Sequence, residues 1–171
     1  MTPLPAPPTP EPPPDADMLK LAPVFAAKVF DLLHRMDRLG HDAVVFEGFR
    51  SDERQAWLYG CGRDYDDGRG VVTNAADGRK SWHRYGLAVD VISKSLAWDV
   101  HPGFWLDLRN CARDLGLTSG YDWTHPDRPH VQWHCDGMYV TPSDHAWALL
   151  QSDGVEAVWR ELHADEFREV A

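Results

Sequence analysis

The stretch from Ser81 to Val91 sets the strongest limit on how this chain can fold, because it places a charged residue, Asp90, within an apolar segment. His83 and Asp90 stand on either side of Gly86, a residue that can turn the chain at little steric cost. Residues 87–92 are apolar or β-branched except for Asp90, and they predict a short strand. An unpaired carboxylate in such a strand is very costly, so Asp90 needs a partner. A metal ion shared with His83 would be one.

The second half of the chain supplies further groups of the same kind. Asp127 stands three residues before His130, and His134 follows four residues after it. Catalytic zinc sites typically use three protein ligands and leave the fourth position open. His83, Asp90 and His130 would make such a set. Asp127 would then lie beside the metal, where a carboxylate can accept a proton from water and pass it to a leaving amine.

The residue types therefore suffice for metal-assisted amide hydrolysis, since zinc lowers the pKa of a bound water to about 7. Their spacing alone does not select that chemistry. Nine histidines in 171 residues will produce chance pairs, and a lone His–Asp pair is more often a structural hydrogen bond. Both interpretations stay open at this point.

The rest of the chain predicts an α+β domain with a small, largely antiparallel sheet that carries the metal site, packed with helices. Helices are expected over 18–39, 51–59 and 102–115, from 141 and from 155; strands are expected over 43–46, 87–92, 130–135 and 138–140. Residues 60–80 predict a long surface loop. Asp136-Gly137 predicts a hairpin. Thr141 is expected to cap a helix that has Pro142 in its first position.

Two terminal regions complete the expected organisation. Residues 1–17 carry eight of the thirteen prolines and predict an extended or disordered leader. Residues 18–171 are expected to form a single domain, in which residues 142–171 supply C-terminal helices that pack on the rest.

Composition excludes several functional classes. A net charge of −10 argues against nucleic-acid binding and against electrostatic docking on anionic membranes. No apolar run approaches the roughly 20 residues that span a bilayer, and no signal-peptide pattern is visible. Three widely spaced cysteines without a CxxC argue against a disulfide framework or a cysteine zinc site. We expect a monomer made in the cytoplasm, without membrane insertion.

Four motifs, in order, resemble one family. Ser81-x-His83-x-x-Gly86-x-Ala88-x-Asp90 resembles the signature of the LAS superfamily of zinc peptidases. This superfamily groups D-alanyl-D-alanine carboxypeptidases and dipeptidases, phage L-alanyl-D-glutamate endopeptidases, and the zinc-binding fold of hedgehog signalling domains. The other motifs are Glu47-Gly48-Phe49-Arg50-Ser51 with Arg54-Gln55, then Val72-Thr73-Asn74-Ala75, and Asp127-x-Pro129-His130-Val131-Gln132. The resemblance covers roughly residues 20–140 and implies a hedgehog/D-Ala-D-Ala peptidase-like fold.

The resemblance also implies roles for individual residues. His83, Asp90 and His130 match the ligands of one Zn²⁺ ion per chain. Asp127 matches the general base. Arg50 is similar to an arginine near the substrate, which would polarise the scissile carbonyl or stabilise its oxyanion. Two further positions, Ser81 and Gln55, match residues that line the substrate cleft.

This chain departs from part of the family at Trp133-His134. The carboxypeptidase and dipeptidase branches usually show Glu-x-x-His with Trp before the histidine, but the residue three before His134 is Val131, which cannot act as a base. We therefore prefer Asp127 and His130 as base and last ligand, a form that looks more like the endopeptidase branch. His134 then either donates a hydrogen bond to the transition state, as part of the substrate site, or caps the hairpin.

The sequence thus predicts a zinc-dependent peptidase that acts on the peptidoglycan stem peptide, as an endolysin-like L-alanyl-D-glutamate endopeptidase. A D-alanyl-D-alanine carboxypeptidase is the alternative within the same class. A zinc-stabilised binding module without turnover is the alternative from another class. The expected place of action is the cell wall, after release as a phage lysin, or cytosolic muropeptides.

Overall fold

The computed structural model describes residues 3–133 and 141–162, and it confirms the predicted α+β class. The helices are α1 (Pro23–Arg38), α2 (Asp52–Gly60), α3 (Pro102–Asp114), α4 (Asp144–Asp153) and α5 (Val155–Leu162); the strands are β1 (Ala43–Glu47), β2 (Ala88–Ser93), β3 (Thr118–Ser119) and β4 (His130–Gln132). Short 3₁₀ turns are η1 (Met18–Lys20), η2 (Gly78–Lys80), η3 (Trp82–Tyr85) and η4 (Gly120–Asp122).

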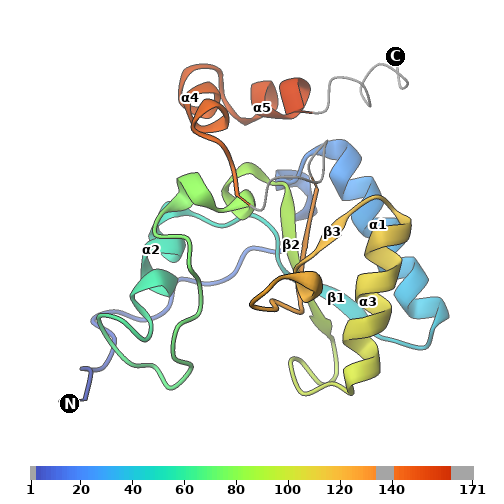
Figure 1. Ribbon diagram of the computed structural model, residues 1–171, viewed down its shortest axis with the longest axis horizontal. Helices are drawn as coiled ribbons and strands as arrows, with labels where there is room; N and C mark the ends of the chain where they lie inside the picture. Colours follow the sequence, from blue (N-terminus) through green and yellow to red (C-terminus); the bar gives the residue numbers. More distant parts are fainter. Residues whose placement is uncertain (1–2, 134–140, 163–171) are drawn as a thin grey trace.

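The four strands form one antiparallel sheet in the order β1-β2-β4-β3 (Figure 1). Every residue of β2 is buried, as the apolar pattern around Asp90 predicts. The two-residue strand β3 was not expected, because two residues are too few to show a periodic pattern. It pairs with the outer side of β4 and completes the sheet.

Helices α1 and α3 pack against each other beside the sheet and close the main core (Figure 1). The positions on α1 that recur at spacings of three and four are fully buried: Phe25, Val29, Leu32 and Met36. Each such side chain contributes roughly 1.5–3 kcal/mol when it leaves water. This packing gives the sheet a rigid backing.

Two helix starts differ from the expectation. The helix expected over 18–39 begins at Pro23, because proline suits the first turn of a helix. Helix α4 is capped by Ser143, whose hydroxyl accepts a hydrogen bond from the Ala146 N–H, so the expected Thr141 cap is wrong. Pro142 consequently lies before the helix instead of in its first turn.

The segment of residues 3–17 runs extended past α2 toward the start of the sheet (Figure 1). Its backbone makes hydrogen bonds to the rest of the chain. The Trp57 indole donates to the Thr9 carbonyl over 3.0 Å, and the Gly48 N–H donates to the Asp15 carbonyl over 2.7 Å. These contacts tie the segment to the body of the molecule. The division into a leader and a single domain stays a prediction.

Helices α4 and α5 lie beyond the turn that precedes β2 (Figure 1). The Trp159 indole donates a hydrogen bond of 2.7 Å to the Tyr85 carbonyl, and Lys80 pairs with Asp144 over 2.9 Å. The described C-terminal helices are thereby anchored next to η3. The hairpin expected at Asp136-Gly137 lies outside the described residues.

Among the helices of the described residues, none combines the length and the apolar character needed to cross a bilayer.

Candidate metal-binding active site

The three predicted ligands, His83, Asp90 and His130, meet at one point although His130 lies 47 residues after His83 in the sequence. His83 Nε2 lies 3.3 Å from His130 Nδ1 and 3.5 Å from Asp90 Oδ1, and His130 Nδ1 lies 3.3 Å from Asp90 Oδ1. The three atoms form a nearly equilateral triangle. Each of the three residues is at most 9% exposed.

The triangle has the size that a tetrahedral metal site requires. Bonds of about 2.0–2.1 Å to zinc place neighbouring ligand atoms roughly 3.3–3.4 Å apart in a tetrahedron. Asp90 Oδ1 is buried and accepts no hydrogen bond, and such a group is costly unless something else compensates it. Within the described residues, this is the group of His, Cys, Asp and Glu that could hold a metal ion. The residues present therefore fit a divalent cation.

Strand pairing and one turn create this geometry. Asp90 in β2 lies directly opposite His130 in β4, so both side chains point to the same face. His83 comes from η3, which ends at Gly86 in a left-handed conformation with φ of +64°. A Cβ at Gly86 would lie 2.4 Å from the Lys20 carbonyl oxygen. The predicted glycine turn is confirmed, and only glycine fits there without strain.

A second layer of hydrogen bonds fixes which ring nitrogen faces the triangle. His83 Nδ1 lies 2.9 Å from the Gly48 carbonyl oxygen, so this nitrogen donates and leaves the Nε2 lone pair free. His130 Nε2 lies 2.9 Å from Gln132 Oε1 and leaves Nδ1 free in the same way. Ring N–H bonds of this kind orient metal-binding histidines and raise their basicity.

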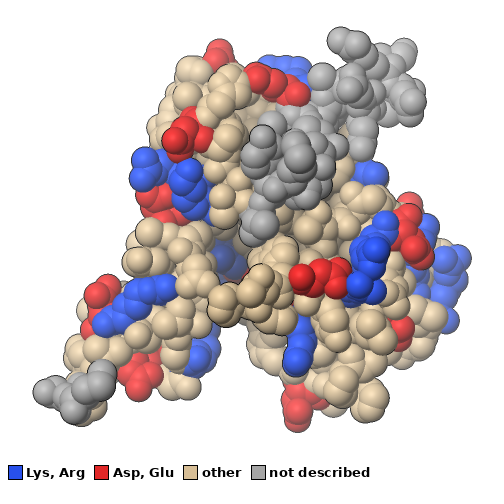
Figure 2. Space-filling model, viewed as in Figure 1, with Lys and Arg blue, Asp and Glu red and all other residues tan. Residues whose placement is uncertain are grey.

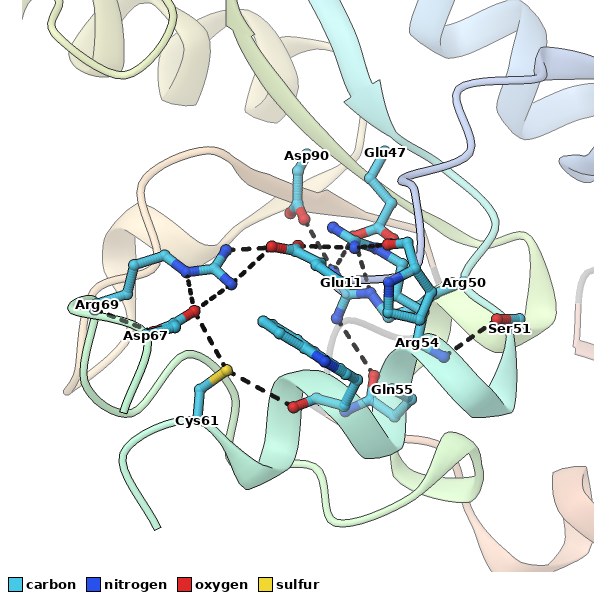
Figure 3. Close-up of polar contacts among 12 residues, drawn as sticks. Glu11, Glu47, Arg50, Ser51, Arg54, Gln55, Cys61, Asp67, Arg69 and Asp90 are labelled. Carbon is cyan, nitrogen blue, oxygen red and sulfur yellow. Dashed lines mark hydrogen bonds and ion pairs between the residues drawn. The ribbon is translucent and has the colours of Figure 1, made fainter. Parts of the chain in front are cut away.

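Arg50 fixes the remaining ligand. Its Nη2 donates to Asp90 Oδ2 over 3.0 Å (Figure 3), and Oδ1 faces the two histidines. The same guanidinium donates twice to Glu47 and once to Gln55. Four of the five N–H donors of Arg50 are thus engaged within the described residues. Arg50 also lines the cavity described below.

The protonation preferences suit a metal site. Burial lowers the pKa of His83, and the Arg50 charge lowers it further. Burial alone would raise the pKa of Asp90, but His83, His130 and Arg50 hold it well below its usual range. Burial opposes the charged form of His130, yet Asp90 raises the pKa of this histidine. A metal ion would replace that proton, because a ligating imidazole must be neutral.

Asp127 lies near the triangle without belonging to it. Its carbonyl accepts the His130 N–H over 3.2 Å, and its own N–H donates to the Gly120 carbonyl over 2.9 Å. Loss of hydration, followed by repulsion from Asp90, raises the pKa of the Asp127 carboxyl. A raised pKa brings a carboxylate closer to the range in which it exchanges protons effectively.

These groups open into a cavity of about 1280 Å³. One wall comes from α2 and the loop after it, with Arg54 and residues 71–75. The opposite wall includes Trp123, whose ring centroid lies 5.0 Å from that of His130. Figure 2 shows the molecule hollowed between the α2 region and the part that carries the sheet. A hollow of this size can admit a peptide.

The structure brings most of the predicted site residues together, with two exceptions. Ser81 lines the cavity. Gln55 is 1% exposed and is not among the described residues of the wall; its amide nitrogen donates to the Ala75 carbonyl over 2.7 Å. It lies behind Arg50 and joins it to the loop. His134 lies outside the described residues.

Two supporting residues were not assigned a role from the sequence, Glu47 and Gln132. Glu47 is 1% exposed and binds two arginines. A β-bulge in β1 pairs Glu47 with Asp90, although Val45 already pairs with Val91. The extra residue, Phe46, turns Glu47 toward the site. Strict alternation would not place it there. Gln132 shares a strand face with His130, and that alternation was the available signal.

Comparison with known proteins agrees with the family resemblance of the sequence motifs. The family model described as D-alanyl-D-alanine carboxypeptidase, VanY, matches residues 18–134. The peptidoglycan L-alanyl-D-glutamate endopeptidase CwlK of Bacillus subtilis (strain 168) is 35% identical over 105 residues, which are 54% of this chain and 61% of the relative. The chain therefore spans about three fifths of the length of that relative.

Two solved structures are similar. The LD-carboxypeptidase LdcB aligns with a TM-score of 0.50 at 15% identity, over 83% of this chain and 69% of that chain. The L-Ala D-Glu endopeptidase ChiX of Serratia marcescens aligns with a TM-score of 0.47 at 25% identity, over 68% of this chain and 82% of that chain. The likeness to LdcB concerns the fold.

Proposed function

The chain belongs to the VanY family of D-alanyl-D-alanine carboxypeptidases, and from this premise we propose that it is a zinc-dependent peptidase that cuts the peptidoglycan stem peptide. The observation that carries the proposal is the triangle of His83 Nε2, Asp90 Oδ1 and His130 Nδ1, whose edges of 3.3–3.5 Å suit a tetrahedral ion. Zinc, when bound, supplies Lewis acidity toward a carbonyl oxygen and toward water.

The residues of the chain supply the remaining tasks. Asp127 takes the proton of the attacking water and passes it to the leaving amine. Such proton transfer typically raises the rate roughly 10²–10⁴-fold. Arg50 holds Asp90 in place through Oδ2. Its remaining Nη1 hydrogen is the donor that it would offer to a substrate oxygen. Ser81 and Trp123 line the cavity in which the peptide would lie.

The bond cut is, in this proposal, the one between L-alanine and D-glutamate. The endopeptidase CwlK, 35% identical over the matched region, supports this choice, as does the Asp127-x-Pro129-His130 form of the last motif. Digestion of purified peptidoglycan, followed by mass spectrometry of the new ends, tests it. New L-alanine carboxyl ends are expected. Release of free D-alanine alone would instead assign the D-alanyl-D-alanine carboxypeptidase activity that the family name describes.

Metal identity is tested separately. We expect about one zinc per chain in the purified protein. The His/Asp ligand set also accepts manganese or cobalt, so activity of the metal-free protein should be compared after each of the three ions is restored. A protein that binds none of them would overturn the proposal.

The other class of function is a metal-stabilised binding module without turnover. We predict that Asp127→Ala retains the metal and loses activity by roughly 10²-fold or more. His83→Ala should lose both, since it removes a ligand. Hydrolysis rates and metal content of the two variants decide the question. Unchanged hydrolysis by Asp127→Ala would contradict its role as base.

A further inference from the structure

The proline-rich segment of residues 3–17 contacts two arginines of the cavity wall through the carboxylate of Glu11. Its Oε1 accepts a hydrogen bond of 2.8 Å from Arg54 Nη1, and its Oε2 accepts one of 2.8 Å from Arg69 Nη2 (Figure 3). Arg54 also donates to the carbonyl of Pro12. One side chain of the segment thus joins helix α2 to the loop that follows it, and both arginines line the cavity.

From Arg54, alternating charges lead without a gap to the metal triangle. Arg54 Nε donates to Glu47 Oε1 over 2.5 Å, and Glu47 Oε2 accepts from Arg50 Nη2 over 2.6 Å. The same Nη2 contacts Asp90 Oδ2 over 3.0 Å. Figure 3 shows this row of side chains, Glu11, Arg54, Glu47, Arg50 and Asp90.

The row is shielded from water along most of its length. The side chains of Arg54 and Glu47 are 3% and 1% exposed, and those of Arg50 and Asp90 are 9% and 12% exposed. Salt screens buried pairs little, and loss of one partner leaves the other as an uncompensated charge. Glu47 divides its two oxygens between two arginines. The arginine that contacts Asp90 is therefore held by the same carboxylate that Arg54 contacts.

We propose that Glu11 is a positioning residue for the metal centre, acting through Arg54, Glu47 and Arg50 on the orientation of Asp90. Residues 3–17 then contribute, through Glu11, to the geometry of the site. The inference rests on the proposed metal site, but it adds a residue that lies outside the segment matched by the family model, which begins at residue 18.

The test uses the full chain and two matched variants. Glu11→Gln removes one negative charge and keeps the size of the side chain, so the fold should survive. Asp31→Asn removes the same charge from the exposed face of α1 and serves as control. We expect zinc affinity, measured by competition with a chromogenic chelator, to fall roughly 2–10-fold in Glu11→Gln and to stay at the parent value in Asp31→Asn. Zinc affinity should fall further in Glu47→Gln, because Glu47 lies nearer to Asp90 in the row.

A second measurement is made on the metal-free protein. The losses of unfolding free energy in Glu11→Gln, Asp90→Asn and the double variant, measured in urea, should be non-additive, because the two side chains are coupled. Parental zinc affinity in Glu11→Gln, or additive losses of unfolding free energy, would overturn the inference and leave the proposed function standing. A parent protein that binds no metal would overturn the proposed function itself, and Glu11 would then have no metal centre to position.

Discussion

At the scale of single residues, the triangle depends on hydrogen bonds that fix which atom of each side chain faces its centre. His83, Asp90 and His130 each present one atom to the triangle because the other polar atom is bound to Gly48, Arg50 or Gln132. Gly86 serves the same end through the backbone. It lets the chain pass from η3 into β2 within one residue of left-handed conformation.

Two glycines with positive φ allow this backbone role to be measured. Gly40 has φ of +88° and open space where a Cβ would lie, whereas Gly86 has φ of +64° and the Lys20 carbonyl oxygen 2.4 Å from that position. Alanine at either position incurs the left-handed penalty of about 1–2 kcal/mol. Gly86→Ala must in addition displace backbone. We expect its loss of unfolding free energy, measured in urea, to be at least about twice that of Gly40→Ala. Equal losses would contradict the close approach.

At the scale of elements, the sequence predicts those whose signal is periodic or punctuated. The apolar spacing of α1, the position of α2 within one residue of the helix expected over 51–59, and the glycine before β2 agree with the pattern. The histidine and aspartate spacing, with the family resemblance, identified the three residues that converge. Each of these signals lies within one short segment, so it can be recognised without knowledge of the fold.

What the sequence could not predict depends on contacts between distant segments. The bulge at Phe46, which turns Glu47 inward, exists only because β1 pairs with β2. The burial of Gln55 behind Arg50 depends on the path of the loop to Ala75. The contacts of Glu11 with Arg54 and Arg69 join residues more than forty positions apart. No periodic pattern encodes them.

The anchoring of the C-terminal helices is testable at this scale. Trp159→Phe removes the hydrogen bond to the Tyr85 carbonyl and should cost about 1 kcal/mol of unfolding free energy, with earlier cleavage of α5 in limited proteolysis. Trp98→Phe, the same change at a side chain that is 48% exposed, is the control. If both variants unfold and cleave like the parent, the docking contact contributes nothing.

At the scale of the whole molecule, buried Tyr85 links stability to alkaline pH. Burial raises the pKa of Tyr85 to about 12, against about 10 in an unfolded chain. The folded state therefore holds this proton more tightly. The resulting stability is complete below pH about 10 and is lost as the pH rises through about 12.

We expect unfolding free energy to fall by about 2–3 kcal/mol over that interval in excess of the change in Tyr85→Phe. Denaturation in urea at steps between pH about 9 and about 12 measures the difference. Tyr59→Phe controls for the loss of a hydroxyl. Parallel curves for the parent and Tyr85→Phe would show that this phenol is not the group responsible.

The pairing of β1, β2 and β4 places Glu47, Asp90 and His130 in one row across the sheet. A single residue inserted into any of these strands would turn part of the row to the opposite face. Length can therefore vary only between the strands, and above all in residues 61–75, of which Arg69 and residues 71–75 line the cavity. In a lineage with this fold, substrate preference can drift by insertions and deletions in that loop, while the segments that carry His83, Asp90 and His130 keep a fixed length.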